Sequence, residues 1–267
     1  MGQGHGLSFE IGIVVPTLGT RPDYLRKCLE SIRLAGKSHI NLVAPSDYDS
    51  APLVSAGLVD QVTPDPRSGL SDAINAGMKT LPERIKLANW LGDDDILKPG
   101  TLDTLAAEFS EPSVVLVYGH CAYIDDNGEK MWSSPTGQFA AQILRFGPDL
   151  IPQPGALFRK EAFEKVGGLS ADFGWAFDFD LLIKLSKIGN LKFVPITVSG
   201  FRWHSDSLTV RARWKSVGEA SKVRRTHLPL FLRPFSFIWE VPVVLATYLA
   251  GIRVNRLALK AKSNGKS

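Results

Sequence analysis

The stretch that decides the fold of this chain runs from Lys86 to Pro99, K-L-A-N-W-L-G-D-D-D-I-L-K-P. An apolar run ends here in three consecutive acids, Asp93, Asp94 and Asp95. Adjacent carboxylates repel one another, so the triplet destabilises the fold unless a cation or solvent relieves it. At the end of a strand, alternate side chains share a face, and Asp93 and Asp95 could then hold one hard divalent cation. The alternative is a solvated loop in which Asp95 caps the helix that Pro99 helps to start.

The segments around this stretch alternate between strand and helix patterns. Residues 11–16 form a β-branched apolar run typical of a strand buried on both faces, and residues 23–32 repeat apolar side chains at helical spacing. Further strands are predicted at residues 40–44, 85–91 and 114–118, with helices at 70–78 and 100–109 between them. This order predicts an α/β fold with a mostly parallel central sheet flanked by helices, in which ligands bind beyond the carboxyl ends of the strands.

The later part of the chain is less regular. An Asn127-Gly128 pair predicts a tight hairpin between residues 121–124 and 130–132. Helices are predicted at residues 138–146, 160–166 and 181–188, and extended segments at 156–158, 193–198 and 201–203.

Composition indicates a globular protein, because 44% of the 267 residues are hydrophobic and 22% are charged. The two cysteines, Cys28 and Cys121, have no metal-ligand spacing and are interpreted as reduced core residues. The first ten residues lack the basic and apolar regions of a signal peptide. We therefore expect a cytoplasmic protein.

Charge divides the chain in two. Residues 1–201 hold 18 Lys and Arg against 24 Asp and Glu, a net of −6, and residues 202–267 hold 13 against 3, a net of +10. A basic end of this kind could contact nucleic acid or an anionic membrane surface.

Four motifs together resemble glycosyltransferase family 2, the inverting nucleotide-sugar transferases with the GT-A fold. Their order and spacing make the resemblance specific. It extends over residues 9–209, which are therefore predicted to form a GT-A glycosyltransferase domain, with residues 210–267 as a basic, apolar C-terminal helical extension. The motifs are Val14-Val15-Pro16-Thr17, residues 68–77 (S-G-L-S-D-A-I-N-A-G), Leu91-Gly92-Asp93-Asp94-Asp95, and residues 177–185 (F-D-F-D-L-L-I-K-L).

The resemblance implies a nucleotide-diphosphate sugar donor and a divalent cation, Mg²⁺ or Mn²⁺, that neutralises the diphosphate leaving group. It assigns the cation to Asp93 and Asp95, with His204 as a further ligand, although a lone histidine is more often a satisfied surface or core residue. Asp94 is expected to point to the opposite face, where it could serve the structure alone. Candidate contacts to the nucleotide sugar are Pro16, Thr17, Asp47, Asp72, Asn75, Asp93 and Asp94.

Two of these contacts have open alternatives. Asp72 and Asn75 lie about one helical turn apart and could equally be exposed polar positions on an amphipathic helix. Family members often carry an acid at the end of the second strand that holds uracil, but Val43-Ala44-Pro45 has none. Asp47 or Asp49 could substitute from the following loop, so the identity of the nucleobase stays open.

The transfer step needs a base that takes the proton of an acceptor hydroxyl. The family's base usually sits in a Glu-Asp pair that opens a helix, and Phe177-Asp178 takes that place, so the resemblance implies Asp178 as the base. Asp180 is the second choice, and its alternative is a cap for the helix that begins at Leu181. Trp175 could stack on a sugar or pack in the core. Trp175 and Asp180 are the candidate acceptor or sugar contacts.

The acceptor implied by the resemblance is a saccharide or lipid-linked saccharide, in cell-surface polysaccharide or glycolipid assembly. Residues 228–252 are almost wholly apolar, but the stretch without charge, Val241 to Ile252, is too short to span a bilayer and is interrupted near its start by Pro242. With the basic residues that follow, residues 228–262 suit a pair of helices at a membrane interface, at the inner face of the plasma membrane. A helix that closes the core and a dimer contact are the alternatives. Nucleic-acid binding fits poorly because of the aliphatic surface.

Two other functions compete with glycosyl transfer. A sugar-phosphate nucleotidyltransferase has a GT-A-like sheet, and Leu18-Gly19-Thr20-Arg21 resembles its Gly-rich loop, but with too few glycines. A non-catalytic carbohydrate-binding protein would have no need to retain Asp93, Asp95 and Asp178 together.

Overall fold

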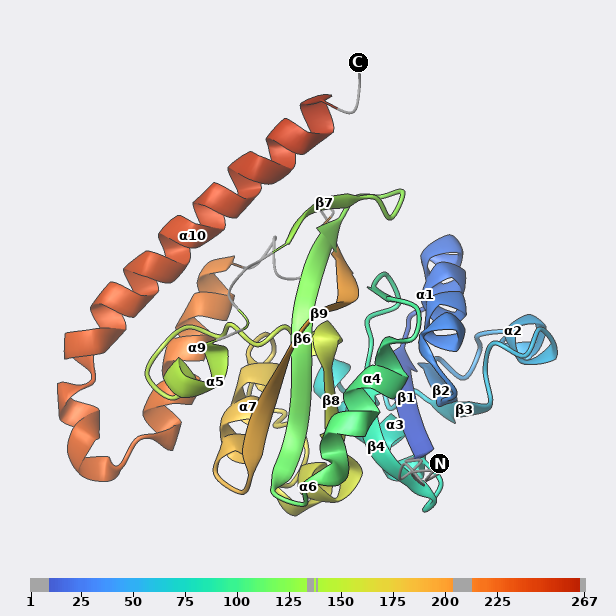
Figure 1. Ribbon diagram of the computed structural model, residues 1–267, viewed down its shortest axis with the longest axis horizontal. Coiled ribbons are helices and arrows are strands. Elements are labelled where there is room, and N and C mark those ends of the chain that lie inside the picture. Colours follow the sequence, from blue (N-terminus) through green and yellow to red (C-terminus); the bar gives the residue numbers. More distant parts are fainter. Residues whose placement is uncertain (1–9, 134–136, 138, 204–212, 265–267) are drawn as a thin grey trace, which may run out of the picture.

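The computed structural model describes residues 10–133, 137, 139–203 and 213–264. Within these residues a single sheet of nine strands crosses the protein in the order β3-β2-β1-β4-β8-β6-β9-β5, with β7 paired to β6 (Figure 1). The strands β1 to β4 are parallel, β6 is parallel to β9, and β8 runs antiparallel between β4 and β6. The strands are β1 (Glu10–Pro16), β2 (His39–Ala44), β3 (Gln61–Pro64), β4 (Ile85–Trp90), β5 (Ile96–Leu97), β6 (Val114–Ile124), β7 (Lys130–Ser133), β8 (Ala156–Arg159) and β9 (Asn190–Arg202).

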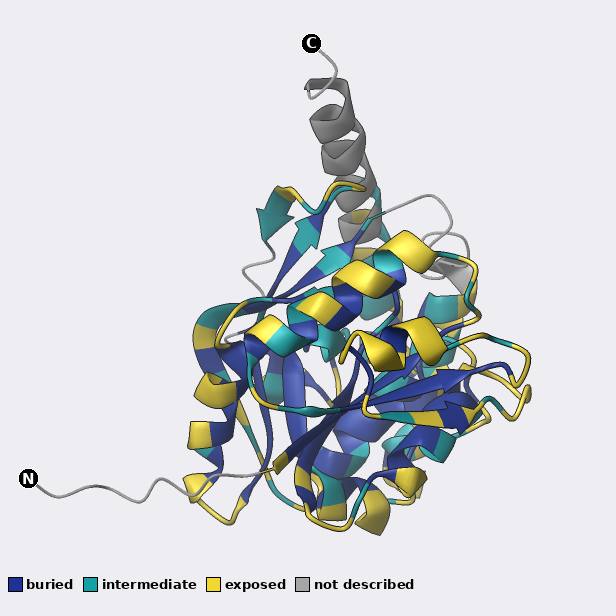
Figure 2. Cartoon of the chain, turned by 90° about the vertical axis from the view of Figure 1, so that its right-hand side faces the viewer, coloured by how far each residue is buried: buried dark blue, intermediate teal, exposed yellow. Residues whose placement is uncertain are grey.

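Helices cover both faces of this sheet, so the predicted α/β architecture is confirmed. One apolar core lies between the sheet and α1, α2 and α4, and a second lies between the sheet and α3, α5, α6 and α7. Figure 2 shows the strands buried between helices whose outer faces are exposed. The helices are α1 (Pro22–Ala35), α2 (Ala51–Ser55), α3 (Leu70–Thr80), α4 (Thr101–Ala107), α5 (Ala140–Ile143), α6 (Lys160–Lys165), α7 (Phe177–Ser186), α9 (Arg213–His227) and α10 (Phe237–Asn264), with 3₁₀ turns η1 (Glu108–Ser110), η2 (Gln153–Gly155) and η3 (Leu230–Phe235).

Close packing of α3 on the sheet depends on Gly77. A Cβ atom at this position would lie 2.4 Å from a methyl group of Val14 on β1 and 2.7 Å from a methyl group of Val43 on β2. No side chain fits at such distances, because protein cores are already packed to crystal density. The glycine thus lets α3 pack closely on β2 and on β1, whose carboxyl end borders the cavity described below.

Three local predictions differ from the structure. Residues 114–124 form one long strand, β6, where two separate segments were expected, because pairing with β9 continues past Gly119 with shifts of register. Helix α7 begins at Phe177, four residues earlier than predicted, so Asp178 and Asp180 lie inside its first turn. Pro242 lies inside α10, as its sixth residue, and the helix continues through it although one N–H donor is missing there.

The C-terminal segment is joined to the rest of the protein through α9. Val223 of α9 belongs to the core formed with α7, and Arg224, only 2% exposed, donates two hydrogen bonds to Glu240 of α10 at 2.7 and 2.6 Å. Helix α10 then extends outside the sheet and its covering helices (Figure 1). Among the described residues, no helix combines the length and hydrophobicity needed to cross a bilayer.

Candidate active site

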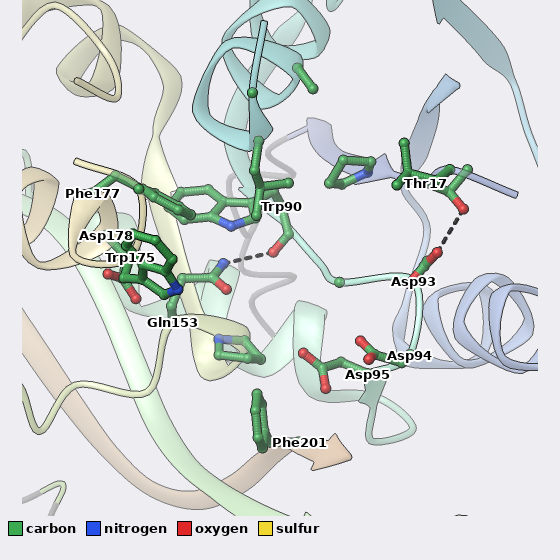
Figure 3. Close-up of a pocket in the computed structure, with 18 of the residues that line it drawn as sticks. Thr17, Trp90, Asp93, Asp94, Asp95, Gln153, Trp175, Phe177, Asp178 and Phe201 are labelled. Atoms are coloured by element: carbon green, nitrogen blue, oxygen red, sulfur yellow. Dashed lines mark hydrogen bonds between the residues drawn. The ribbon is translucent and has the colours of Figure 1, made fainter. Parts of the chain in front are cut away.

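A cavity of about 680 Å³ opens beyond the carboxyl ends of β1 and β4, where such sheets bind ligands. Its volume lies within the range of small-molecule sites. The acidic triplet lies on one side, and Trp175, Phe177 and Asp178 lie on the other (Figure 3). The two sides come from segments far apart in the sequence, so the fold brings two of the predicted metal ligands, Asp93 and Asp95, and the predicted base Asp178 to one cavity.

The acids occupy a turn between β4 and β5, closed by a hydrogen bond of 3.0 Å from the Asp95 amide to the Gly92 carbonyl. The alternation expected for a strand therefore does not apply, and Asp94 lines the cavity together with Asp93 and Asp95. The expectation that Asp94 points to the opposite face is wrong for this reason. Arg21 also connects the two neighbours, with its guanidinium 2.6 Å from Asp93 and 2.5 Å from Asp94.

Each acid of the triplet is held by a different partner. Thr17 Oγ1 donates to Asp93 Oδ2 at 2.7 Å, so both oxygens of Asp93 have a protein donor in this structure. Asp95 accepts a hydrogen bond of 3.0 Å from the Arg202 backbone amide. Arg202 is 1% exposed and its guanidinium donates to the carbonyl of Asp94 at 2.8 Å. These contacts hold the turn from two sides, the loop between β1 and α1 and the end of β9.

The chemistry of the triplet fits a divalent cation bound in part by substrate. Mg²⁺ and related ions are bound by one or two carboxylates together with phosphate oxygens. Burial raises the pKa of Asp95 well above its usual range, and the charge of Asp94 raises it further. A cation would relieve this cost. Asp95 is the better-placed ligand, since Asp93 is already bonded through both oxygens, and within the described residues no group of three or more His, Cys, Asp or Glu forms a complete metal site.

Asp178 lies in the first turn of α7, on the opposite wall from the triplet. Burial raises its pKa to about 6, although a hydrogen bond of 2.8 Å from the Phe179 amide acts in the other direction. A carboxylate with a pKa near neutrality is suited to act as a general base. Phe177, which stands where the family pattern has an acid, is 8% exposed and packs against Trp90, with ring centroids 6.4 Å apart.

Trp175 borders the same wall and is partly exposed. Its indole Nε1 is buried, and among the described residues it has no hydrogen-bond partner. Buried donors are usually paired, so an unpaired one at a cavity wall is available to a bound ligand. Gln153 lies nearby and is fixed by a hydrogen bond of 2.8 Å from Nε2 to the carbonyl of Trp90 (Figure 3).

Several sequence-based candidates do not line the cavity. The Asp47 carboxylate is 85% exposed and pairs with Arg67, and Asp72 lies outside the lining on α3. Asn75 exchanges hydrogen bonds of 2.9 and 3.0 Å with the backbone of Leu169, which gives it a structural role. Pro16 and Thr17 do line the cavity.

Asp180 is directed away from the cavity, toward the C-terminal segment. It is 2% exposed and lies 2.6 Å from Lys184 Nζ and 2.7 Å from His227 Nε2. The position of Asp180 therefore does not support its role as a sugar contact or a second base. His204 lies outside the described residues.

The sequence reasoning missed four residues that line or fix the site. Arg21 lies only four residues after Thr17, and a cation in the loop after the first strand was the available signal. Arg202 adjoins the Trp203-His204 segment, and its burial could not be foreseen. Asp149 lines the cavity from an irregular loop, and its pKa is raised well above the usual range by burial and by the charge of Asp178. Asp65 borders the cavity after β3, closer to the site than Asp47.

Comparison with known proteins identifies the class. The glycosyl transferase family 2 model matches residues 12–167, more than half of the chain. The chain therefore belongs to glycosyltransferase family 2, which confirms the predicted family and GT-A fold and supports glycosyl transfer over the two competing functions. A search of curated proteins finds no match.

Solved structures agree on the fold. Residues 1–349 of S. aureus TarS superpose with a TM-score of 0.60 at 14% identity, covering 91% of this chain and 71% of that one. The same protein has been solved with UDP-GlcNAc, with a TM-score of 0.61, 14% identity, and coverage of 82% and 65%. The mannosyltransferase PcManGT from Pyrobaculum calidifontis, solved with GDP-Man and Mn²⁺, has a TM-score of 0.60 at 16% identity, covering 96% of this chain and 79% of that one.

Proposed function

We propose that this protein is an inverting glycosyltransferase that moves a sugar from a nucleoside-diphosphate sugar to an acceptor hydroxyl. The observation that carries the proposal is the placement of an acidic turn and a carboxylate of raised pKa on opposite walls of one cavity. The structural neighbours solved with UDP-GlcNAc and with GDP-Man support a donor of this class. The acceptor is a saccharide or lipid-linked saccharide, in polysaccharide or glycolipid assembly.

The donor side of the cavity is built for a charged leaving group. Asp95, with Asp93, would hold a divalent cation, Mg²⁺ or Mn²⁺, which when bound neutralises the diphosphate. Thr17 and Arg21 hold Asp93 in place, and Arg21 is also a cation within the cavity lining. Asp65 and Arg67, which border the cavity near the end of β3, are placed to contact the nucleoside.

The acceptor side supplies the base. An acceptor hydroxyl attacks the anomeric carbon as its proton passes to the Asp178 carboxylate, and the bond from that carbon to the diphosphate oxygen breaks. One displacement of this kind inverts the anomeric configuration, through an oxocarbenium-like transition state. Trp175, whose indole N–H has no partner among the described residues, would contact the acceptor sugar.

A panel of nucleoside-diphosphate sugars tests this proposal in the presence of Mn²⁺. Donor turnover is measured for the unaltered protein, for Asp95→Ala and for Asp178→Asn. We expect Asp95→Ala to lose Mn²⁺-dependent donor binding, measured as a thermal shift. We expect Asp178→Asn to retain that binding and to lose turnover by roughly 100-fold or more, the usual contribution of a general base.

Two outcomes contradict the assignment. If Asp95→Ala keeps its Mn²⁺-dependent thermal shift with the donor, the cation is held elsewhere. If Asp178→Asn turns over at the normal rate, the base is another group. Asp103→Asn, which removes an exposed carboxylate on α4 outside the cavity, serves as the matched control for both variants.

We further propose that η3 and α10 contact an anionic membrane surface, where lipid-linked acceptors are found. Large apolar side chains stay exposed along this segment, among them Phe231 at 72%, Phe237 at 63% and Val241 at 65%. Basic residues follow in the sequence at Arg253, Arg256, Lys260 and Lys262. Apolar and basic residues in succession suit a helix lying at the interface rather than across it.

Sedimentation with vesicles tests this contact in the full chain. We expect binding to vesicles that contain phosphatidylserine, and a loss of at least about tenfold in the double variant Ile238→Asp/Leu245→Asp, since burying each side chain is worth about 1.5 to 3 kcal/mol. Both side chains are more than half exposed, as is Leu34 on α1, so Leu34→Asp is the control. Equal vesicle binding by the double variant and the control would contradict the proposal.

A further inference from the structure

Glu219 of α9 holds the loop that carries one wall of the cavity. Its carboxylate accepts three backbone hydrogen bonds, from the amides of Gly174 at 3.1 Å, Trp175 at 2.8 Å and Ala176 at 3.1 Å. Helix α7 begins directly after this loop, at Phe177. Glu219 thus accepts hydrogen bonds from three consecutive N–H groups directly before the helix that carries the proposed base.

One of these N–H groups, that of Ala176, lies at the cap of α7, and the other two lie in the loop before the helix. The first turn of a helix leaves its amide donors without partners inside the helix, and a carboxylate is a strong acceptor there. The residue at the helix cap, Ala176, has no side chain that could act instead. The acceptor therefore comes from a different helix, more than forty positions later in the chain.

Glu219 is an acid in a helix, α9, that is otherwise basic. The helix reads R-W-K-S-V-G-E-A-S-K-V-R-R-T-H, with a single acid among five lysines and arginines. The side chain of that acid faces the body of the protein, whereas Lys215, Lys222 and Arg225 are exposed. A surface carboxylate in such a basic helix would have lysines and arginines as neighbours. Glu219 instead accepts hydrogen bonds from three backbone amides, which indicates a specific role for this contact.

Other side chains of α9 contact the same region. His227 lies 2.7 Å from Asp180 in the first turn of α7, and Arg224 donates to the carbonyl of Gly147 at 3.2 Å, two residues before Asp149. Lys215 lies 5.2 Å from the centre of the Trp175 ring. Helix α9 therefore touches α7, the loop before it and the segment that carries the second cavity acid.

We propose that Glu219 is a positioning residue that fixes Trp175 and the first turn of α7, and with it Asp178, at the cavity wall. This inference rests on the proposed function, in which Asp178 is the base. Without the three acceptor contacts, the loop and the start of α7 lose their anchor, and the carboxylate of Asp178 is no longer held at one place relative to the donor. The acid triplet lies on the opposite wall, so donor binding is not affected directly.

The experiment compares Glu219→Gln and Glu219→Ala with Asp172→Asn in the full-length protein. Asp172→Asn removes an exposed carboxylate from the same loop and is the matched control. We expect kcat to fall roughly 10-fold in Glu219→Gln, which keeps one acceptor oxygen, and roughly 100-fold in Glu219→Ala, because small displacements of catalytic groups cost this much. The donor KM should stay within about twofold of the control.

Hydrogen exchange gives a readout that does not depend on activity. The amides of residues 174–176 should exchange faster in both Glu219 variants than in Asp172→Asn, while the amides of β1 and β4 stay protected. This pattern separates a local loss of positioning from a general loss of folding.

Three results would overturn the inference while leaving the proposed base intact, provided that Asp178→Asn has lost turnover. They are a kcat in both variants equal to that of Asp172→Asn, unchanged exchange at residues 174–176, and an equal loss of kcat and donor affinity. If Asp178→Asn itself retains turnover, the proposed function fails first, and the exchange data still report whether Glu219 holds the loop.

Discussion

Two carboxylates in the first turn of α7 have opposite electrostatic environments. Burial raises the pKa of Asp178 to about 6 at the cavity wall. Burial acts in the same direction on Asp180, but hydrogen bonds from His227 and Lys184 outweigh it and lower the pKa of that carboxylate. The folded structure therefore disfavours the ionised form of Asp178 and favours the ionised form of Asp180.

The two acids should have opposite effects on the free energy of unfolding. The folded protein binds the Asp178 proton more tightly than the unfolded chain does. The free energy of unfolding therefore decreases, through this group, as the pH rises from about 4 to about 6. We expect Asp178→Asn to raise the free energy of unfolding at pH 7 by roughly 1 to 2 kcal/mol, discounted for partial exposure.

Asp180 has the reverse sign. Its stabilising effect is present above its unfolded pKa and is lost as the pH falls through the lower folded value. We expect Asp180→Asn to lower the free energy of unfolding at pH 7 by about 2 kcal/mol, because Lys184 and His227 lose their partner. Urea unfolding at pH 7 measures both variants, and a change of the same sign in the two would contradict this account.

Transfer should also depend on pH through Asp178. Only the ionised carboxylate can take the acceptor proton, so kcat should be constant above the pKa of about 6 and fall about tenfold per unit below it. A pH profile at saturating donor measures this. A rate that stays level down to pH 5 would assign the base to another group.

At the scale of elements, sequence patterns predicted those that carry a strong apolar period. Helix α1 and strands β1, β2 and β4 have the predicted type and nearly the predicted bounds, because burial sets their pattern directly. The predictions failed where pairing outweighs local pattern. Gly119 and His120 interrupt the apolar run of β6, and only its pairing with β9 keeps that strand continuous.

The candidate site divides in the same way. Thr17, Asp93, Asp95 and Asp178 were predicted because each lies in a short motif, and Trp175 because it stands next to one. All of them line the cavity. Arg21 and Asp149 line it too, and Arg202 and Glu219 hold it, but these were missed. Arg202 and Glu219 contact residues that are distant in sequence, and no local pattern indicates such a contact.

Gly77 gives a prediction about packing of α3. We expect Gly77→Ala to lower the free energy of unfolding by about 1 to 3 kcal/mol, because the new methyl group would overlap Val14 and Val43. Gly218→Ala on α9 is the control, since a Cβ there meets no described atom within 4 Å, and it should be neutral or stabilising by up to about 1 kcal/mol. Urea unfolding measures both variants. If Gly77→Ala and Gly218→Ala change the free energy of unfolding equally, α3 can move away from the sheet.

At the scale of the whole molecule, one buried ion pair joins α10 to the rest. Arg224 and Glu240 are 2% and 6% exposed, and removing one partner leaves the other charge buried without compensation. We expect Arg224→Met to lower the free energy of unfolding by about 3 to 5 kcal/mol. The control is Arg225→Met, which replaces the exposed neighbouring arginine and should change the free energy of unfolding little.

The double variant Arg224→Met/Glu240→Leu distinguishes charge burial from lost packing. It should recover most of the stability lost in Arg224→Met, because no unpaired charge remains. A double variant as unstable as the single one would show that the shape of the pair, rather than its charge, holds α10.

The division of the cavity between two parts of the chain has a consequence for how such an enzyme can change. The acidic turn lies within residues 12–167, which the family model matches, whereas Trp175, Asp178 and Glu219 follow that range in the chain. A crossover between related genes near residue 167 would exchange the acidic turn and leave Trp175, Asp178 and Glu219 together. Glu219 and the loop it binds would be inherited as one piece, so such an exchange would not separate Asp178 from the helix that supports its loop.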